Sequence, residues 1–163
     1  DALPILRRHV HPGPAPRTGS ATVEFGLTLA LLLLLAAGVV DIGRALMQYN
    51  TLAKSVRVAA RHLGTLTPGT DHDAVRCLAV TGSTDTDDGD CEDDPLVPGL
   101  TPDEVVVCDR SNCADHNLHD TGQGQVHLVS VQITGLAYTP VTGLVLQSLG
   151  FSAIRATFSM PAT

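Results

Sequence analysis

Glu24 stands at the edge of a long uncharged stretch, which is an unusual place for a carboxylate. The sixteen residues from Phe25 to Val40 carry no charge. A charged side chain beside a membrane-length apolar segment is energetically costly, so it is kept mainly where a partner or a processing enzyme uses it. A helix-end role is also open, because a carboxylate near a helix N-terminus is stabilised by the macrodipole. Gly19 lies five residues before Glu24.

Four cysteines offer a second kind of chemistry. An even number of cysteines in a chain that crosses a membrane indicates two disulfides in an oxidising compartment. Cys108 and Cys113 enclose only four residues and would close a turn after a strand. Cys77 with Cys91 would tether a short helix to an acidic loop. Crossed pairings and four reduced thiols both stay open.

The segment from Asp85 to Asp94 carries seven carboxylates in ten residues. Alternating Asp residues with a glycine are similar to a calcium-binding EF-hand loop, but the Glu at the twelfth position and the two flanking helices are missing. We therefore interpret the segment as a solvated acidic loop, with calcium binding as the alternative.

His116 and His119 lie three residues apart and are candidate zinc ligands. A zinc site needs a third protein ligand and a rigid scaffold, and the sequence indicates a loop here, so we expect no metal and no other cofactor. Neither a Gly-x-Ser-x-Gly elbow nor a Cys–His pair is visible. The sequence thus predicts a protein that is not an enzyme, with a metal-dependent envelope enzyme built on the two histidines as an alternative.

The charge of the chain restricts its partners. The formal net charge is −7, and aromatic residues make up only 3% of the chain. An acidic surface disfavours binding to nucleic acid. The low aromatic content predicts a light core in whatever part of the chain is soluble.

One long helix over residues 20–63 must position the N-terminal motif, and we place its membrane-spanning part at about residues 25–42. Residues 25–40 alone span roughly 24 Å of a bilayer core of about 30 Å, so neighbouring apolar residues must contribute. Beyond Asp41, apolar residues recur at spacings of three and four: Ile42, Leu46, Tyr49, Ala53, Val56, Ala60 and Leu63. This stripe predicts that the second half of the helix packs on a domain, and Gly64 ends the helix.

The remaining residues divide into a leader and a small domain. Residues 1–19 are interpreted as a leader, because several prolines prevent a helix and the arginines suit a cytoplasmic side. Residues 64–163 are predicted to form an extracytoplasmic α+β domain with a short helix and an acidic loop at 83–103. Its elements are expected at 73–80 (helix), 104–108, 126–134 and 151–160 (antiparallel strands) and 141–149 (an apolar turn or short helix).

The N-terminal motif resembles that of a known family. Gly19, Glu24, Phe25 and the apolar helix are similar to the prepilin-peptidase motif of type IV pilins. With Asp-Ile-Gly-Arg at 41–44 and Ala-Ala-Arg at 59–61, the chain resembles the TadE-like pseudopilins of tight-adherence (Tad, or Flp-type) pilus systems. The resemblance covers about residues 19–63. It implies a pilin-like fold, in which the first half of a long helix spans the membrane and the second half packs on a small antiparallel sheet.

The resemblance also implies roles and partners. Cleavage after Gly19 by a prepilin peptidase frees the amine of Ser20, and the assembly residues Glu24 and Phe25 follow, with Glu24 pairing to the amine of a neighbouring subunit. The implied partners are this peptidase, other pilin and pseudopilin subunits, the pilus assembly machinery and membrane lipid. We therefore expect a minor pseudopilin or assembly subunit, single-pass in the cytoplasmic membrane with its C-terminal domain outside.

A secreted or membrane-anchored binding protein with an ordinary signal peptide is the alternative. Residues 25–40 are close to the length of a signal-peptide core, and Ala-Ala-Gly at 36–38 offers the small residues that a signal peptidase accepts. Glu24 at the edge of the apolar run, and the amphipathic stripe beyond it, favour the pilin-type interpretation. The mature N-terminus separates the two.

Overall fold

The computed structural model describes residues 18–87, 89–122, 124–140, 143 and 149–161. The chain divides into two compact units, residues 1–36 and 37–163, which are described one at a time. The predicted leader lies outside the described residues except for Thr18 and Gly19. The elements are α1 (Thr18–Leu63), α2 (His72–Val80), β1 (Thr86–Asp87), β2 (Asp90–Cys91), η1 (Pro102–Glu104), β3 (Val105–Cys108), η2 (Ala114–His116), β4 (His119–Asp120), β5 (Gln125–Ile133), β6 (Ala137–Tyr138), β7 (Leu149–Gly150) and β8 (Ile154–Pro161).

The first unit contains the N-terminal part of α1. This part is rich in Leu and Ala, which are strong helix formers, and α1 contains no proline. Every residue from Gly19 to Ala36 is exposed, although most of them are apolar. Between Gly19 and Leu63 the helix is long and apolar enough to cross a membrane. Exposed leucines that find no protein core are well accommodated in lipid, so this part of α1 is a candidate membrane span.

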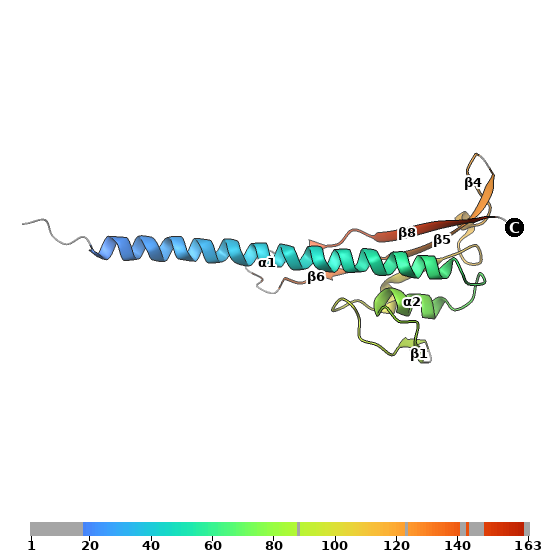
Figure 1. The fold of residues 1–163 in the computed structure, drawn as a ribbon, viewed down its shortest axis with the longest axis horizontal. Coiled ribbons are helices and arrows are strands. Elements are labelled where there is room, and N and C mark those ends of the chain that lie inside the picture. Colours follow the sequence, from blue (N-terminus) through green and yellow to red (C-terminus); the bar gives the residue numbers. More distant parts are fainter. Residues whose placement is uncertain (1–17, 88, 123, 141–142, 144–148, 162–163) are drawn as a thin grey trace, which may run out of the picture. The chain divides into compact units, whose positions relative to one another are not determined.

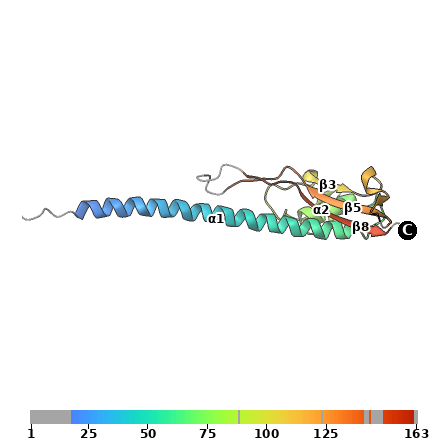
Figure 2. The same cartoon turned by 90° about the horizontal axis from the view of Figure 1, so that it is seen from above.

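The second unit is built on a small antiparallel sheet with β5 at its centre. Strand β8 pairs with β5 from Val126 to Ile133, and β3 and β4 pair with its other edge. Figures 1 and 2 show β5 and β8 running beside the C-terminal half of α1. The long helix followed by an antiparallel sheet confirms the predicted α+β class, and β4 adds a short strand to the three that the sequence predicts.

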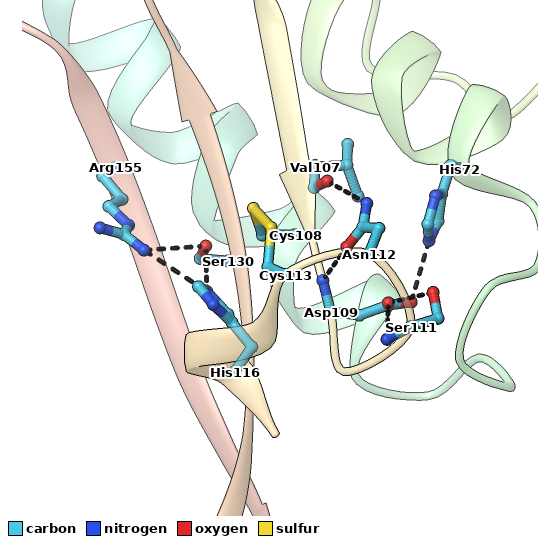
Figure 3. The surroundings of a disulfide bond; sticks show 10 residues. All are labelled: His72, Val107, Cys108, Asp109, Ser111, Asn112, Cys113, His116, Ser130 and Arg155. Atoms are coloured by element: carbon cyan, nitrogen blue, oxygen red, sulfur yellow. Dashed lines mark hydrogen bonds and ion pairs between the residues drawn. A yellow bond between two sulfur atoms is a disulfide. The ribbon is translucent and has the colours of Figure 1, made fainter. Parts of the chain in front are cut away.

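The alternation along β5 agrees with the predicted period of two. His127, Val129, Val131 and Ile133 are all buried. Ser130, between two of them, points to the other face and is also buried, because η2 covers that side (Figure 3). The central strand is therefore covered on both faces near Ser130.

The core lies between the second half of α1, α2 and one face of the sheet. It contains Leu52, Val56, Ala59, Ala60 and Leu63 from α1; Val75, Leu78, Ala79 and Val80 from α2; and Val105, Val107, Val129, Val131, Ile133 and Ile154 from the sheet. Ala59 and Ala60 are fully buried. Their small side chains agree with the light core that the low aromatic content predicts.

The predicted stripe on α1 is wrong in its first turns. Ile42, Leu46 and Tyr49 are exposed, whereas Asp41 and Ala45 are buried. The buried positions precede the predicted ones by one residue, which is about 100° around a helix of 3.6 residues per turn. From Val56 to Leu63 the predicted stripe is correct. The exposed apolar residues of the first turns border a small apolar pocket with Phe151.

Two predicted segments differ in detail. The predicted acidic loop 83–103 contains a small hairpin of β1 and β2, and its glycine at position 89 adopts a positive φ of 91° in the turn between them. The end of the predicted loop forms the short helix η1. Most of the predicted apolar turn at 141–149 lies outside the described residues. Its last residue, Leu149, belongs to β7, which pairs with β6.

Candidate functional site

The residues of the N-terminal motif all lie in the first two turns of α1. Gly19, Ser20, Glu24 and Phe25 are exposed, and the Phe25 ring is 67% exposed. A Cβ atom added at Gly19 would meet no atom within 4 Å. Another protein could therefore contact each of these four residues.

The Glu24 side chain is available for a partner. In the part of the chain that the structure describes, no ion pair involves Glu24. The hydroxyl of Thr28 donates to the backbone carbonyls of Glu24 and Phe25, at 3.1 and 2.9 Å, and therefore does not engage the Glu24 carboxylate. What remains at the helix start is an accessible carboxylate next to an apolar surface.

Two disulfides tie the second unit together. Cys77 of α2 is bonded to Cys91 of β2, and Cys108 at the end of β3 is bonded to Cys113 just before η2. The Cα atoms of the two pairs lie 5.3 and 5.5 Å apart. The structure therefore has the two sequence-local pairs, and the crossed pairings are not adopted.

A buried carboxylate organises the loop closed by the Cys108–Cys113 disulfide (Figure 3). Asp109 is 1% exposed, and its side chain accepts hydrogen bonds from the Gly69 amide at 2.8 Å, from His72 Nε2 at 2.9 Å and from the amide and hydroxyl of Ser111. Burial alone would raise the pKa of Asp109, but the hydrogen bonds from Ser111, His72 and Gly69 outweigh it and hold the pKa well below its ordinary value. Asp109 is thus ionised and links three segments.

Asn112 completes the same loop. Its side-chain oxygen accepts a hydrogen bond from the Asp109 amide at 2.8 Å, and its side-chain nitrogen donates to the Val107 carbonyl at 2.8 Å. The Cys113 amide donates to the Asp109 carbonyl at 3.0 Å. Because these backbone groups find partners within the loop, its conformation does not depend on the disulfide alone.

His116 is buried on the far side of the same disulfide. It is 5% exposed, and its Nε2 atom is hydrogen-bonded to Ser130 Oγ at 2.8 Å. Arg155 donates to the same Ser130 oxygen at 3.2 Å (Figure 3). Burial and then the neighbouring Arg155 charge lower the pKa of His116, so the imidazole is neutral near pH 7.

The two histidines that the sequence singled out are placed differently. His119 lies exposed on β4, and His116 is buried in η2. Both line one open pocket together with Arg155. Among the described residues, the group whose possible ligand atoms lie within 4.8 Å of one another is Cys108, Cys113 and His116, without His119, and its two sulfurs are bonded to each other.

The accessible N-terminal motif and its helix agree with a known family. Residues 19–61 match the TadE-like protein family. This is the resemblance that the motif at Gly19, Glu24 and Phe25 indicates, and it is confirmed for this segment. No curated protein and no solved structure matches the chain. This match supports an association of the protein with Tad pili.

The acidic loop that follows the TadE-like segment presents its carboxylates to solvent. The side chains of Asp85, Asp87, Asp90, Glu92, Asp93 and Asp94 are exposed. The metal-compatible group found among the described residues lies elsewhere. Calcium binding by this loop gains no support from the geometry of its described residues.

The Asp109 cluster is not among the features that the sequence predicts. A local signal was present, because Asp109 is followed two residues later by Ser111, and an Asp side chain commonly accepts a hydrogen bond from the amide two residues on. No local signal identifies Gly69 or His72 as partners, since they lie 40 and 37 residues away. The burial of Asp41 on α1 was also missed, and its backbone carbonyl accepts a hydrogen bond from the Tyr138 hydroxyl.

Proposed function

We propose that this protein is a minor pseudopilin or assembly subunit of a Tad/Flp-type adhesive pilus, made as a prepilin and cut after Gly19. The observation that carries the proposal is the TadE-like match, which begins at residue 19 and includes an exposed Glu24 at the start of an exposed apolar helix. The chemistry it needs is binding and assembly rather than catalysis.

Processing would create the charge that Glu24 requires. Cutting the peptide bond after Gly19 leaves a free amine on Ser20, four residues before Glu24. Residues four apart lie on nearly the same side of a helix, so each subunit would present a cation and an anion close together. A charge in hydrocarbon costs about 2.5–3.5 kcal/mol on insertion scales, so pairing the amine of one subunit with Glu24 of the next relieves a penalty on both.

The second unit would lie outside the cytoplasm. Its two disulfides favour an oxidising compartment. The proposed topology is a single pass through the cytoplasmic membrane, with residues 1–19 inside as a leader and residues 64–163 outside. The partners are then the prepilin peptidase at Gly19, lipid along the exposed leucines, and other pilin subunits at Glu24 and Phe25.

Substitution of Glu24 tests the assembly role. We expect Glu24→Ala and Glu24→Gln to be cut after Gly19 and to remain in the membrane, because the peptidase site is intact. Both variants should fail to co-purify with sheared pili or to support piliation, because the neighbour's amine loses its counter-charge. Immunoblots of membrane and pilus fractions, with electron microscopy of cells, measure the two steps separately.

The matched control is Ser20→Ala, which keeps the new amine and removes only the side chain that carries no proposed role. It should be processed and assembled like the native protein. Normal piliation by Glu24→Ala would show that the carboxylate is only a helix-end charge, and would remove the proposed role.

A further inference from the structure

We propose that Cys108, Cys113 and His116 form a zinc-binding site when the Cys108–Cys113 disulfide is reduced. The site is independent of the proposed pilus role, because its residues lie at the end of β3, just before η2 and in η2, far along the chain from the TadE-like segment. Zinc and the disulfide would be alternative closures of the same loop.

The three ligand atoms are already gathered. The two sulfur atoms and a ring nitrogen of His116 all lie within 4.8 Å of one another. Figure 3 draws the disulfide and the His116 side chain in one close-up. In sequence the ligands are spaced Cys-x₄-Cys-x₂-His. Two cysteines separated by four residues fall within the spacing of structural zinc sites, and thiolate and imidazole are the ligands that zinc prefers.

The unpartnered nitrogen of His116 is a second and independent indication. His116 Nδ1 is buried and has no hydrogen-bond partner among the described residues. The other ring nitrogen, Nε2, is occupied by Ser130 Oγ. Buried polar atoms without a partner are rare in native proteins and point to a bound ion or to a functional role. We assign Nδ1 as the zinc ligand.

The surroundings suit this assignment. Coordination through Nδ1 leaves the proton on Nε2, which then donates to Ser130 Oγ at 2.8 Å, and such a hydrogen bond from the second nitrogen orients most zinc-bound histidines. The 3.4 Å contact of Arg155 with Nε2 must then give way, and Arg155 keeps its hydrogen bond to Ser130 Oγ at 3.2 Å. Two thiolates balance the charge of Zn²⁺, so the nearby Arg155 cation does not oppose binding.

Small side-chain movements are enough to admit the ion. Two thiolates bound at about 2.3 Å to a tetrahedral zinc lie about 3.8 Å apart, so the sulfurs must separate from their bonded positions. The Cα atoms of Cys108 and Cys113 are 5.5 Å apart, and the hydrogen bonds of Asp109 and Asn112 hold the loop between them. The backbone can therefore keep its conformation while the cysteine side chains turn.

Reduction of the Cys108–Cys113 disulfide by a trialkylphosphine supplies the two thiols. A trialkylphosphine takes the oxygen of water to become a phosphine oxide, and its two electrons break the sulfur–sulfur bond to give two thiols. Zinc then displaces one proton from each thiol as it binds both thiolates.

Cobalt titration of the full-length protein in detergent tests the proposal. The Cys77→Ser/Cys91→Ser variant removes the other disulfide, so that only Cys108 and Cys113 supply thiols. After phosphine reduction we expect one equivalent of Co²⁺ to bind with the visible absorption of a tetrahedral thiolate complex, and Zn²⁺ to displace it. The oxidised variant should bind no cobalt in this form.

Histidine variants in the same background identify the third ligand. His116→Ala should weaken zinc binding by about tenfold or more, and His116→Cys should keep it by replacing one zinc ligand with another. His119→Ala, which removes the exposed neighbouring imidazole, should bind like its parent. A loss of binding in His119→Ala, or unchanged binding in His116→Ala, would overturn the assignment.

Alkylation gives a readout that does not depend on colour. Zinc should protect Cys108 and Cys113 of the reduced native chain from an alkylating reagent, as measured by mass spectrometry of the two cysteine peptides. Equal alkylation with and without stoichiometric zinc, in protein whose circular dichroism shows a retained fold, would refute the site.

Discussion

His72 Nε2 lies 2.9 Å from Oδ2 of Asp109, which joins the first residue of α2 to the residue that follows β3. Helix α2 begins without a side-chain cap, because its N-cap residue Asp71 makes no such hydrogen bond. The contact with Asp109 therefore holds the start of a helix that lacks the usual local stabilisation. The same carboxylate binds the Gly69 amide in the turn after α1, so one side chain fastens the α1–α2 connection to the sheet.

Removal of this carboxylate should destabilise the second unit. We expect Asp109→Ala to lower the free energy of unfolding by about 1–3 kcal/mol, because the Gly69 and Ser111 amides lose a buried acceptor. Urea unfolding followed by tyrosine fluorescence measures the change. Asp115→Ala, an exposed carboxylate in the same region, is the control and should change stability by less than about 0.5 kcal/mol. Equal effects of the two substitutions would contradict the structural role of Asp109.

Two valines on opposite sides of one turn of α1 test which face of the helix is buried. Val56 is fully buried and Val58 is 55% exposed. Val56→Ala should cost about 2 kcal/mol of unfolding free energy, because it leaves a cavity between α1 and the sheet. Val58→Ala makes the same change in helix propensity and should be close to neutral. A larger loss for Val58→Ala would mean that α1 is rotated relative to this arrangement.

Both disulfides should be present in protein from its native host. Mass spectrometry after alkylation, with and without prior reduction, is expected to show four protected cysteines paired as Cys77–Cys91 and Cys108–Cys113. In the chain-entropy account the shorter loop contributes about 2 kcal/mol and the longer about 3 kcal/mol. Four freely alkylated thiols would place the second unit in a reducing compartment and contradict the proposed topology.

Processing should depend on the small size of Gly19, because the proposed cleavage takes place directly after this residue. Gly19→Leu should leave a larger precursor in the membrane, because a bulky side chain blocks entry of the leader into the peptidase cleft. A side chain at this position meets no described atom within 4 Å, so the fold should be unaffected. Gly26→Leu is the matched control, since a Cβ there also meets nothing within 4 Å, and it should be processed to a mature chain beginning at Ser20. A mature chain beginning at Val39 would instead support the secreted alternative.

Local patterns determined most of the elements. The uncharged run and its continuation predict α1, whose observed start at Thr18 and end at Leu63 lie within two residues of the prediction. The alternation of apolar and polar residues likewise predicts β5, because a strand places successive side chains on opposite faces. The TadE-like resemblance also depends only on neighbouring residues, and these are visible in the chain as written.

The tertiary structure decided what distant segments do to one another. The positions of the sheet and of Tyr138 decide which face of α1 is buried near Ala45. The periodicity of apolar residues along the sequence does not predict these positions. The partners of Asp109 come from the α1–α2 connection, and His116 meets Cys108 because η2 folds back over Ser130. A hydrogen bond or a metal ligand set requires atoms a few ångströms apart. Spacing along the sequence specifies such distances only within a turn or a strand, so the contacts between segments had to come from the fold.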